Sequence, residues 1–270
     1  MYLDKKGEVV VVVIIALAVI ISSFFAINQI SDGNMVTGAA IGLGNIKTQA
    51  SCGDTITSST TLTENLGPCS NLDGLIIGAN NVVLDCAGYK IIGENDLNKY
   101  GVKNPQYNRI TIKNCSITNF SIGISFSRDS LLSTIINNTL FTNTDGIYIF
   151  NSNTTTIINN TIKNQTQHGL WLVGVGDGLI INNLIENNGI SDLTTKNGIN
   201  IDFGDYSSNL TFINNTLYNN SIAIEASVTE TRFYNNKFNY TPIINGNAVT
   251  IWNTTYDNTT KNIVYGIPTG

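Results

Sequence analysis

The chain has 270 residues, of which 42% are hydrophobic and only 12% are charged, with a net charge of −5 at pH 7. This length can bury one continuous core, and the acidic balance, without a Lys/Arg cluster on any repeat, excludes the electrostatic footprint of a nucleic-acid-binding protein. Asparagine accounts for 40 residues, and with Ser, Thr and Gly it predicts a neutral polar surface typical of an exported protein.

The N-terminal region predicts a membrane anchor. Residues 9 to 27, VVVVVIIALAVIISSFFAI, contain no charge, and a helix of this length spans about 28 Å, close to the hydrocarbon thickness of a bilayer. Lys5 and Lys6 precede this segment, and the next positive charge is Lys47. The positive-inside bias therefore places residues 1 to 8 in the cytoplasm, the transmembrane helix at 9 to 27, and the rest of the chain outside the cell.

Two alternatives for this leader remain open. A cleaved signal peptide would explain the apolar run, although the run is long and no small-x-small site follows it directly. A prepilin-type leader would be cut after Gly7, but Val12 stands where such leaders usually carry a glutamate at the fifth mature position. Residues 28 to 51, rich in Gly, Ala, Asn and Thr, are expected to form a flexible stalk.

From residue 52 to about residue 265 the sequence repeats one short phrase. It reads TIINNTL at 134 to 140, TIINNTI at 156 to 162, LIINNLI at 179 to 185 and TFINNTL at 211 to 217. The steps between the first asparagines of successive pairs are 22, 23, 32 and 21 residues for Asn137, Asn159, Asn182, Asn214 and Asn235. A period of about 22 residues with variable insertions predicts a solenoid.

The pattern inside each unit identifies the type of solenoid. Apolar residues alternate, as in Gly-Ile-Tyr-Ile at 146 to 149, which predicts strands with one inward face. A leucine-rich repeat would show a fixed Leu framework, whereas Ile and Asn dominate here. We therefore predict an all-β domain: a right-handed, single-stranded parallel β-helix of about eight coils over residues 52 to 265. Asparagines of successive coils would stack into an amide ladder and provide left-handed corners.

Four cysteines lie in the first coils of this domain. Cys86 and Cys115 follow the repeat marker in successive coils, where stacking would bring their Cα atoms about 5 Å apart, inside the range of a disulfide. Cys52 and Cys69 would then close the first turn. We predict the disulfides Cys52–Cys69 and Cys86–Cys115, with buried free thiols as the alternative. Neither the cysteine spacing nor the lone His indicates a metal site, and we expect no cofactor.

One outward column of the solenoid carries the most site-like residues. Aligning the coils on their Gly-Ile strands places Tyr148 and Trp171 on adjacent coils, facing outward. Aromatic rings bind the apolar faces of sugars while carboxylates and amides hold hydroxyl groups. The alternative is that the loop at 186 to 197 folds over both rings and buries them. The candidate ligand-binding residues are Asp145, Tyr148, His168, Trp171, Asn197 and Asn200.

A catalytic site is less well supported by the sequence. NTDG at 143 to 146 and the His-Gly at 168 and 169 are similar to motifs of pectin-type glycosidases, which use paired aspartates on neighbouring coils. Here the next coil offers Gln-His-Gly, and no Arg-x-Lys follows. Asp202 and Glu225 form another carboxylate pair but lack aromatic or basic residues in their columns. An acidic cluster for calcium, as a lyase needs, is also missing from the sequence. We therefore assign no catalytic residue.

The chain contains twelve N-x-S/T sequons. Four fall inside the repeated phrase and are explained by it, at Asn114, Asn137, Asn159 and Asn214. Six others are candidate glycosylation sites in a glycosylating host: Asn119, Asn153, Asn164, Asn239, Asn253 and Asn258.

The run CGDTITSSTTLTENLGPCSNLDGLIIGANNVVLDCAGYKIIG (52 to 93), followed by VKNPQYNRITIKNCSITNFSIGI and the INNT phrases, resembles secreted right-handed β-helix proteins of the NosD-like group. The resemblance covers about residues 52 to 255 and implies a pectin-lyase-like fold and an extracytoplasmic compartment. The group is named after a periplasmic protein linked to copper delivery. One His and two Met residues provide too few soft ligands for copper here.

Together these observations predict a single-pass membrane protein whose extracellular β-helix binds carbohydrate or another cell-surface polymer without catalysis. A polysaccharide hydrolase or lyase of the same fold is the first alternative. A structural or adhesive surface stalk is the second.

Overall fold

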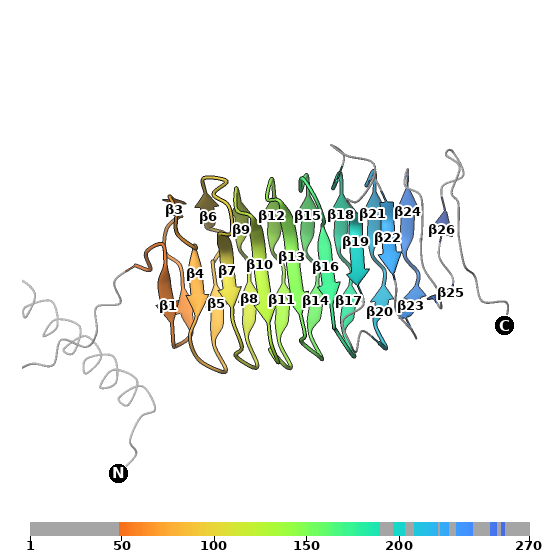
Figure 1. The fold of residues 1–270 in the computed structure, drawn as a ribbon, viewed down its shortest axis with the longest axis horizontal. Helices are drawn as coiled ribbons and strands as arrows, with labels where there is room; N and C mark the ends of the chain where they lie inside the picture. Colours follow the sequence, from red (N-terminus) through yellow and green to blue (C-terminus); the bar gives the residue numbers. More distant parts are fainter. Residues whose placement is uncertain are drawn as a thin grey trace, which may run out of the picture. The chain divides into compact units, whose positions relative to one another are not determined.

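The protein, seen in a computed structural model, is described for residues 49–189, 197–202, 208–220, 222–226, 231–239, 249–252 and 255–256. In these residues the regular secondary structure consists of strands alone, arranged in three parallel sheets that we name A, B and C (Figure 1). Thr48–Gly270 forms one compact unit. The predicted anchor at 9 to 27 lies outside the described residues, and within them no helix could cross a membrane.

The strands of each sheet come from successive coils. Sheet A contains β1 (Asp54–Ile56), β4 (Leu75–Ile77), β7 (Tyr100–Asn104), β10 (Ile122–Ser127), β13 (Asp145–Phe150), β16 (Leu170–Val173), β19 (Asn197–Asp202) and β22 (Ile222–Ala226). Sheet B contains β2 (Thr60–Thr61), β5 (Val83–Asp85), β8 (Thr111–Lys113), β11 (Thr134–Ile136), β14 (Thr156–Ile158), β17 (Leu179–Ile181), β20 (Thr211–Ile213), β23 (Thr231–Tyr234) and β25 (Val249–Trp252). Sheet C contains β3 (Leu66–Cys69), β6 (Lys90–Gly93), β9 (Ser116–Thr118), β12 (Thr139–Phe141), β15 (Thr161–Lys163), β18 (Leu184–Glu186), β21 (Thr216–Tyr218), β24 (Lys237–Asn239) and β26 (Thr255–Tyr256).

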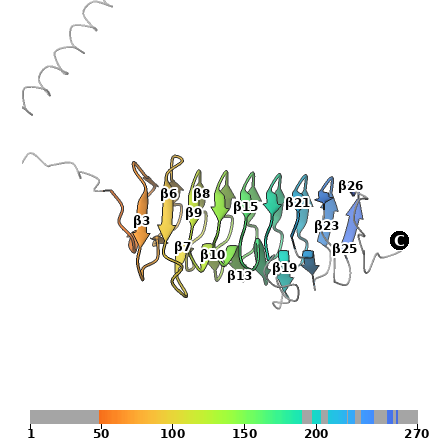
Figure 2. The same ribbon diagram turned by 90° about the horizontal axis from the view of Figure 1, so that it is seen from above.

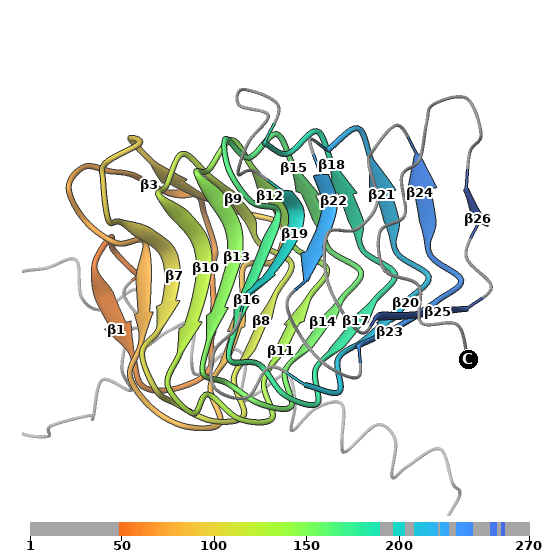
Figure 3. The same ribbon diagram turned by 45° about the vertical axis from the view of Figure 1, so that its right-hand side comes forward.

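The chain passes from sheet A to sheet B to sheet C and then starts the next coil (Figure 3). Seen from above, the coils follow one another in chain order (Figure 2). Sheet A joins eight described strands, so about seven turns separate its first strand from its last. The predicted parallel β-helix is therefore confirmed. Residues 257 to 265, the predicted end of the domain, lie outside the described residues.

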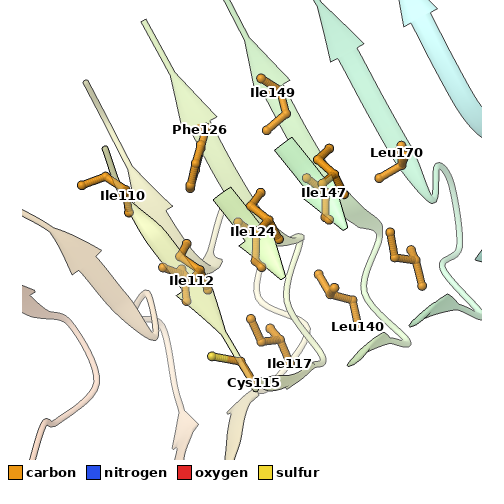
Figure 4. Close-up of a cluster of buried hydrophobic side chains, with 14 of the residues drawn as sticks. Ile110, Ile112, Cys115, Ile117, Ile124, Phe126, Leu140, Ile147, Ile149 and Leu170 are labelled. Carbon is orange, nitrogen blue, oxygen red and sulfur yellow. The ribbon is translucent and has the colours of Figure 1, made fainter. Parts of the chain in front are cut away.

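The core is a set of stacked apolar columns inside the coils. Ile124, Ile147 and Leu170 of sheet A are fully buried, and Ile117 and Leu140 of sheet C face them across the interior (Figure 4). The prediction that the apolar residue after each of these glycines faces the interior is thus confirmed for these coils. Each inward residue lies over its counterpart one coil away, so the hydrophobic contact continues along the whole solenoid.

The two asparagines of each repeated pair have different roles. The first is exposed and adopts a left-handed backbone, with φ of 54 to 56° at Asn137, Asn159 and Asn182. The second is buried, and its amide joins neighbouring coils. Asn160 accepts hydrogen bonds from Asn138 N and Nδ2 at 2.9 and 3.0 Å, and its own Nδ2 donates to Asn183 Oδ1 at 3.0 Å. We call this column the first ladder; its amide members are Asn138, Asn160, Asn183, Asn215 and Asn236.

A second ladder runs along the next corner, five residues further on, and the sequence interpretation missed it. Asn143 N donates to Gln165 Oε1 at 2.8 Å, and Gln165 N donates to Asn188 Oδ1 at 3.0 Å. Asn188 N continues the column to Asn220 Oδ1 at 3.0 Å. All four amides are buried. Each coil is therefore tied to the next at two corners by side chains that accept otherwise orphaned backbone N–H groups.

Both predicted disulfides are present. Cys52–Cys69 joins Cα atoms 5.5 Å apart, and Cys86–Cys115 joins Cα atoms 4.7 Å apart. Cys115 N also donates to Asn138 Oδ1 at 2.9 Å. The Cys86–Cys115 bridge therefore occupies the start of the first ladder, where a covalent bond replaces the amide-to-amide contact.

The second coil departs from the repeat at Asp85. Aligning VLDCAG with IKNCSI predicts that Asp85 shares the column of Asn114. The strands instead pair Asp85 with Lys113, and Ala87 takes the left-handed corner with φ of 50°. Burial raises the pKa of Asp85, but hydrogen bonds from the Asn114 side chain, the Ala87 backbone and Lys113, together with the Lys113 charge, outweigh it and lower this pKa overall.

Acidification is expected to remove this contribution to stability. Because the folded-state pKa of Asp85 is lowered, the carboxylate stabilises the fold above the pKa of the unfolded chain, about 3.9, and the contribution disappears as pH falls through the folded value. Urea unfolding between pH 2 and 6 should therefore show a smaller acid-dependent loss in Asp85→Asn than in the wild type. Identical slopes in the two proteins would contradict this assignment.

Candidate functional site

The candidate site lies on the outer face of sheet A, on β13 and β16. Strand alternation buries Ile147 and Ile149 inside and leaves Tyr148 half-buried on the outer surface. Trp171 is half-buried in the same way on β16, and the register places it beside Tyr148. The predicted outward column is therefore confirmed, because the strands of both coils stay in register through the whole segment.

The two rings are in contact. Their centroids are 4.8 Å apart and their planes are tilted by 50°, within the range of favourable aromatic pairs. Phe150, the next outward residue of β13, has its ring centroid 6.3 Å from that of Tyr148. These three side chains form a continuous aromatic surface, which we call the aromatic face.

Asp145 and His168 border the aromatic face and are bonded to each other. Asp145 Oδ1 lies 2.8 Å from His168 Nδ1 and also accepts the His168 backbone N–H at 3.0 Å. The imidazole lies 5.1 Å from the Trp171 ring, centroid to centroid. Asp145 and His168 are only 4% and 7% exposed. The carboxylate therefore fixes the orientation of the imidazole, which in turn packs against the indole ring.

The two asparagines predicted for this surface lie on β19. The register pairs Asn200 with Trp171, and the Asn200 side chain is buried. Asn197 pairs with Ile222 in the column of Asp145, but its side chain lies outside the described residues. Residues 190 to 196, in the loop that could fold over the two rings, also lie outside the described residues. The structure thus brings Asp145, Tyr148, His168 and Trp171 together and places Asn200 in the adjacent coil.

The chemistry of this surface is that of a polar-edged aromatic platform. In the described residues, no group of three or more His, Cys, Asp or Glu side chains is placed to hold a metal ion. Asp145, the carboxylate that borders the aromatic face in the described residues, directs Oδ1 to His168. The arrangement offers ring faces for stacking and fixed polar groups at one border, both of which suit binding of a sugar.

The sequon asparagines lie at different corners. Asn153 and Asn164 are exposed, whereas Asn119 is half-buried and accepts hydrogen bonds from Thr118 and Thr142. Asn153 Oδ1 accepts the Gly176 N–H at 2.8 Å. The Asn239 side chain and all of Asn253 and Asn258 lie outside the described residues.

Known proteins agree with the fold described above. Residues 69–238 match the family described as a right-handed beta helix region. The chain belongs to the right-handed β-helix family. No curated protein matches the sequence of this β-helix protein.

Solved structures similar to this β-helix protein include two enzyme domains. The first is the enzymatically active domain of tailspike protein 2 of bacteriophage CBA120, with 11% identity, a TM-score of 0.36, and 75% of this chain and 42% of that chain covered. The second is the catalytic domain of a GH87 α-1,3-glucanase in complex with nigerose, with 13% identity, a TM-score of 0.31, and 78% and 63% covered. The chain spans less than two thirds of either structure, and similarity at this level carries no argument about activity.

Proposed function

We propose that this β-helix protein binds carbohydrate without catalysis, through the aromatic face of sheet A. The observation that carries the proposal is the contact between the half-buried rings of Tyr148 and Trp171 beside the fixed Asp145–His168 pair. Flat rings stack on the apolar faces of sugars, and polar groups at their border hold hydroxyl groups. The two rings lie on adjacent coils along the axis of the solenoid, an arrangement that suits successive units of a polymer.

Binding is favoured over hydrolysis by the state of Asp145. A general acid or base must reach the reacting oxygen, but Asp145 is 4% exposed and its Oδ1 already accepts two hydrogen bonds from His168. The carboxylate is thus a positioning group for the imidazole in this proposal. Hydrolase or lyase activity and a purely structural stalk are the alternatives that the experiment below separates.

The placement of the protein is part of the proposal. The apolar segment at 9 to 27 would anchor the chain with its N-terminus inside, and the two disulfides support an oxidising compartment outside the cytosol for the solenoid. Protease added to intact cells should then remove the solenoid, whereas recovery of the full-length chain from the soluble cytosol would refute this placement. The compartment is the one that the NosD-like resemblance implies.

Substitution of Trp171 is expected to weaken the binding of polymeric glycans that the wild type retains on an array. Loss of an aromatic contact of about 1.5 kcal/mol corresponds to an affinity about tenfold weaker. Trp171→Ala should therefore lose binding by at least that factor. Asp145→Asn should keep its affinity within about threefold, because an amide oxygen can still accept from His168. Tyr89→Ala, which removes an exposed aromatic ring at a distant corner, is the matched control.

The same variants identify the alternative functions. Release of reducing ends from a bound polysaccharide that is abolished in Asp145→Asn would show that the protein is an enzyme and overturn the proposal. A protein that binds no glycan, with no effect of either substitution, would leave the structural stalk.

A further inference from the structure

A hollow lies at the corner between sheets A and B, near the end of β13 and lined by none of the aromatic-face residues. It has a volume of about 420 Å³ and is lined by loop residues that follow β4, β7 and β10, which lie side by side in successive coils (Figure 1). This volume falls within the range of sites for small ligands. The lining residues are Asn80, Gln106, Tyr107, Asn108, Arg128 and Asp129.

Two of the three amides that line this corner pocket are held in one orientation. Asn80 Oδ1 accepts the Asn108 backbone N–H at 2.8 Å, and Asn108 Oδ1 accepts the Leu131 backbone N–H at 2.8 Å. Because both oxygens are occupied by backbone groups, the Nδ2 groups of both amides remain as donors. Within the described residues neither Nδ2 group has a hydrogen-bond acceptor. The backbone ladder of this corner therefore leaves two donors at the pocket.

Tyr107 is also fixed by its neighbours. The buried Asn104 side chain donates to Tyr107 O at 2.8 Å and accepts from Tyr107 N at 2.9 Å. The Tyr107 side chain is half-buried and packs against the core. One ring at the pocket is thus held in place by the fold, without ordering by a ligand.

Arg128 and Asp129 both adopt a left-handed backbone, which is costly for arginine. Both are left-handed, with φ of 47 and 56°, and both are exposed. Their N–H groups donate to Phe150 O and Asn151 O of the next coil at 2.9 and 2.7 Å. The left-handed region is disfavoured for side chains such as arginine, whereas Gly and Asn enter it readily. No ion pair or side-chain hydrogen bond of Arg128 or Asp129 occurs in the described part of the chain, so both charged groups can contact a ligand in the pocket.

We propose that this corner pocket binds one residue of a neutral saccharide. Vicinal hydroxyl groups both donate and accept, so they match the mixed set of Arg128 and the two Nδ2 donors with the Asp129 carboxylate as acceptor. The Tyr107 ring provides the apolar contact that a sugar face needs. An anionic sugar fits less well, because its carboxylate would face the Asp129 carboxylate. The pocket uses none of the residues of the aromatic face, so the two sites are separately testable.

The test uses full-length protein that carries Trp171→Ala, so that the aromatic face is removed from the measurement. The probes are neutral gluco-, galacto- and manno-oligosaccharides, with oligogalacturonates in parallel. We expect Trp171→Ala to retain binding of at least one neutral series, and Trp171→Ala with Arg128→Asn to lose it by at least tenfold. Arg109→Asn is the matched control, since Arg109 is an exposed, left-handed arginine at the same corner and does not line the pocket.

Stability provides an independent readout. Asparagine tolerates the left-handed backbone better than arginine does, so Arg128→Asn should raise Tm by about 2 °C while binding is lost. A binding loss that comes with a fall in Tm would instead indicate disruption of the corner and overturn the proposal.

Asp129→Asn tests the ligand class, because it should change the affinities for neutral and acidic saccharides in opposite directions. Removal of the carboxylate should weaken binding of the neutral series and strengthen binding of oligogalacturonates. Neutral binding that is unchanged in both Arg128→Asn and Asp129→Asn, or binding of oligogalacturonates alone by the starting protein, would overturn the proposal. Neutral binding that depends on Arg128 but not on Trp171 would support the corner pocket even if the function of the aromatic face were wrong.

Discussion

Asn160→Ala is expected to lower the free energy of unfolding by about 3 to 5 kcal/mol. Asn160 is buried in the first ladder, and its oxygen accepts from both the backbone and the side chain of Asn138. Its Nδ2 group donates to Ile135 O at 2.9 Å and to Asn183 Oδ1 at 3.0 Å. Alanine would leave these groups unpaired in the interior, and each buried unsatisfied group costs about 1 to 3 kcal/mol. Urea unfolding at neutral pH measures the loss.

The neighbouring asparagine is the matched control. Asn159 is exposed and left-handed, with φ of 55°, and glycine adopts this conformation without strain. Asn159→Gly should therefore change stability by less than about 0.5 kcal/mol. If both substitutions lower the free energy of unfolding equally, the different roles assigned to the two asparagines are wrong.

Gly123→Ala is the second substitution expected to have a large effect, of about 3 kcal/mol or more. A Cβ at Gly123 would lie 2.7 Å from Gly146 O of the next coil and 2.6 Å from Leu140 Cδ2. The carbonyl belongs to the strand backbone, so relief of the clash would have to separate β10 from β13. Thermal unfolding should show the change as a Tm at least 6 °C lower.

Gly178→Ala is the control for Gly123→Ala. It measures the loss of stability when the added methyl group meets a side chain instead of the backbone. Its nearest neighbour would be a terminal methyl, Leu210 Cδ2 at 2.8 Å, and the nearest backbone atom would be Thr155 O at 3.6 Å. A methyl at the end of a side chain can turn away, so the loss should be well below that of Gly123→Ala. Equal losses would contradict the assignment of the Gly123→Ala loss to the clash with Gly146 O.

Much of the fold follows from the sequence because one coil determines the next. The alternation around Ile147 fixes which side chains face inward, and the repeat period then places Tyr148 beside Trp171. The second ladder was not predicted from the sequence, because its column contains Gln165 among asparagines. In addition, the left-handed corner before it carries Thr142 in one coil instead of asparagine. A fixed spacing of five residues from the first ladder, as from Asn160 to Gln165, is the signal that could have revealed it.

The site was less predictable than the fold. Alternation predicts which residues face outward, but the bond between Asp145 and His168 depends on side-chain rotamers and on the shape of the corner before β16. The corner pocket escaped prediction for a related reason. Arg128 belongs to a loop outside the repeated phrase, and only the stacking of three coils brings it near Asn80.

The disulfide at the start of the first ladder gives the solenoid a direction. A stack of coils that contact only their neighbours can open from either end, but Cys86–Cys115 joins two coils covalently near the N-terminal end. Fraying should then begin at the opposite end and travel back, one coil at a time, until it reaches the bridge. A protein pulled or digested from its C-terminal side would thus shorten in steps of about one repeat while its first coils stay closed.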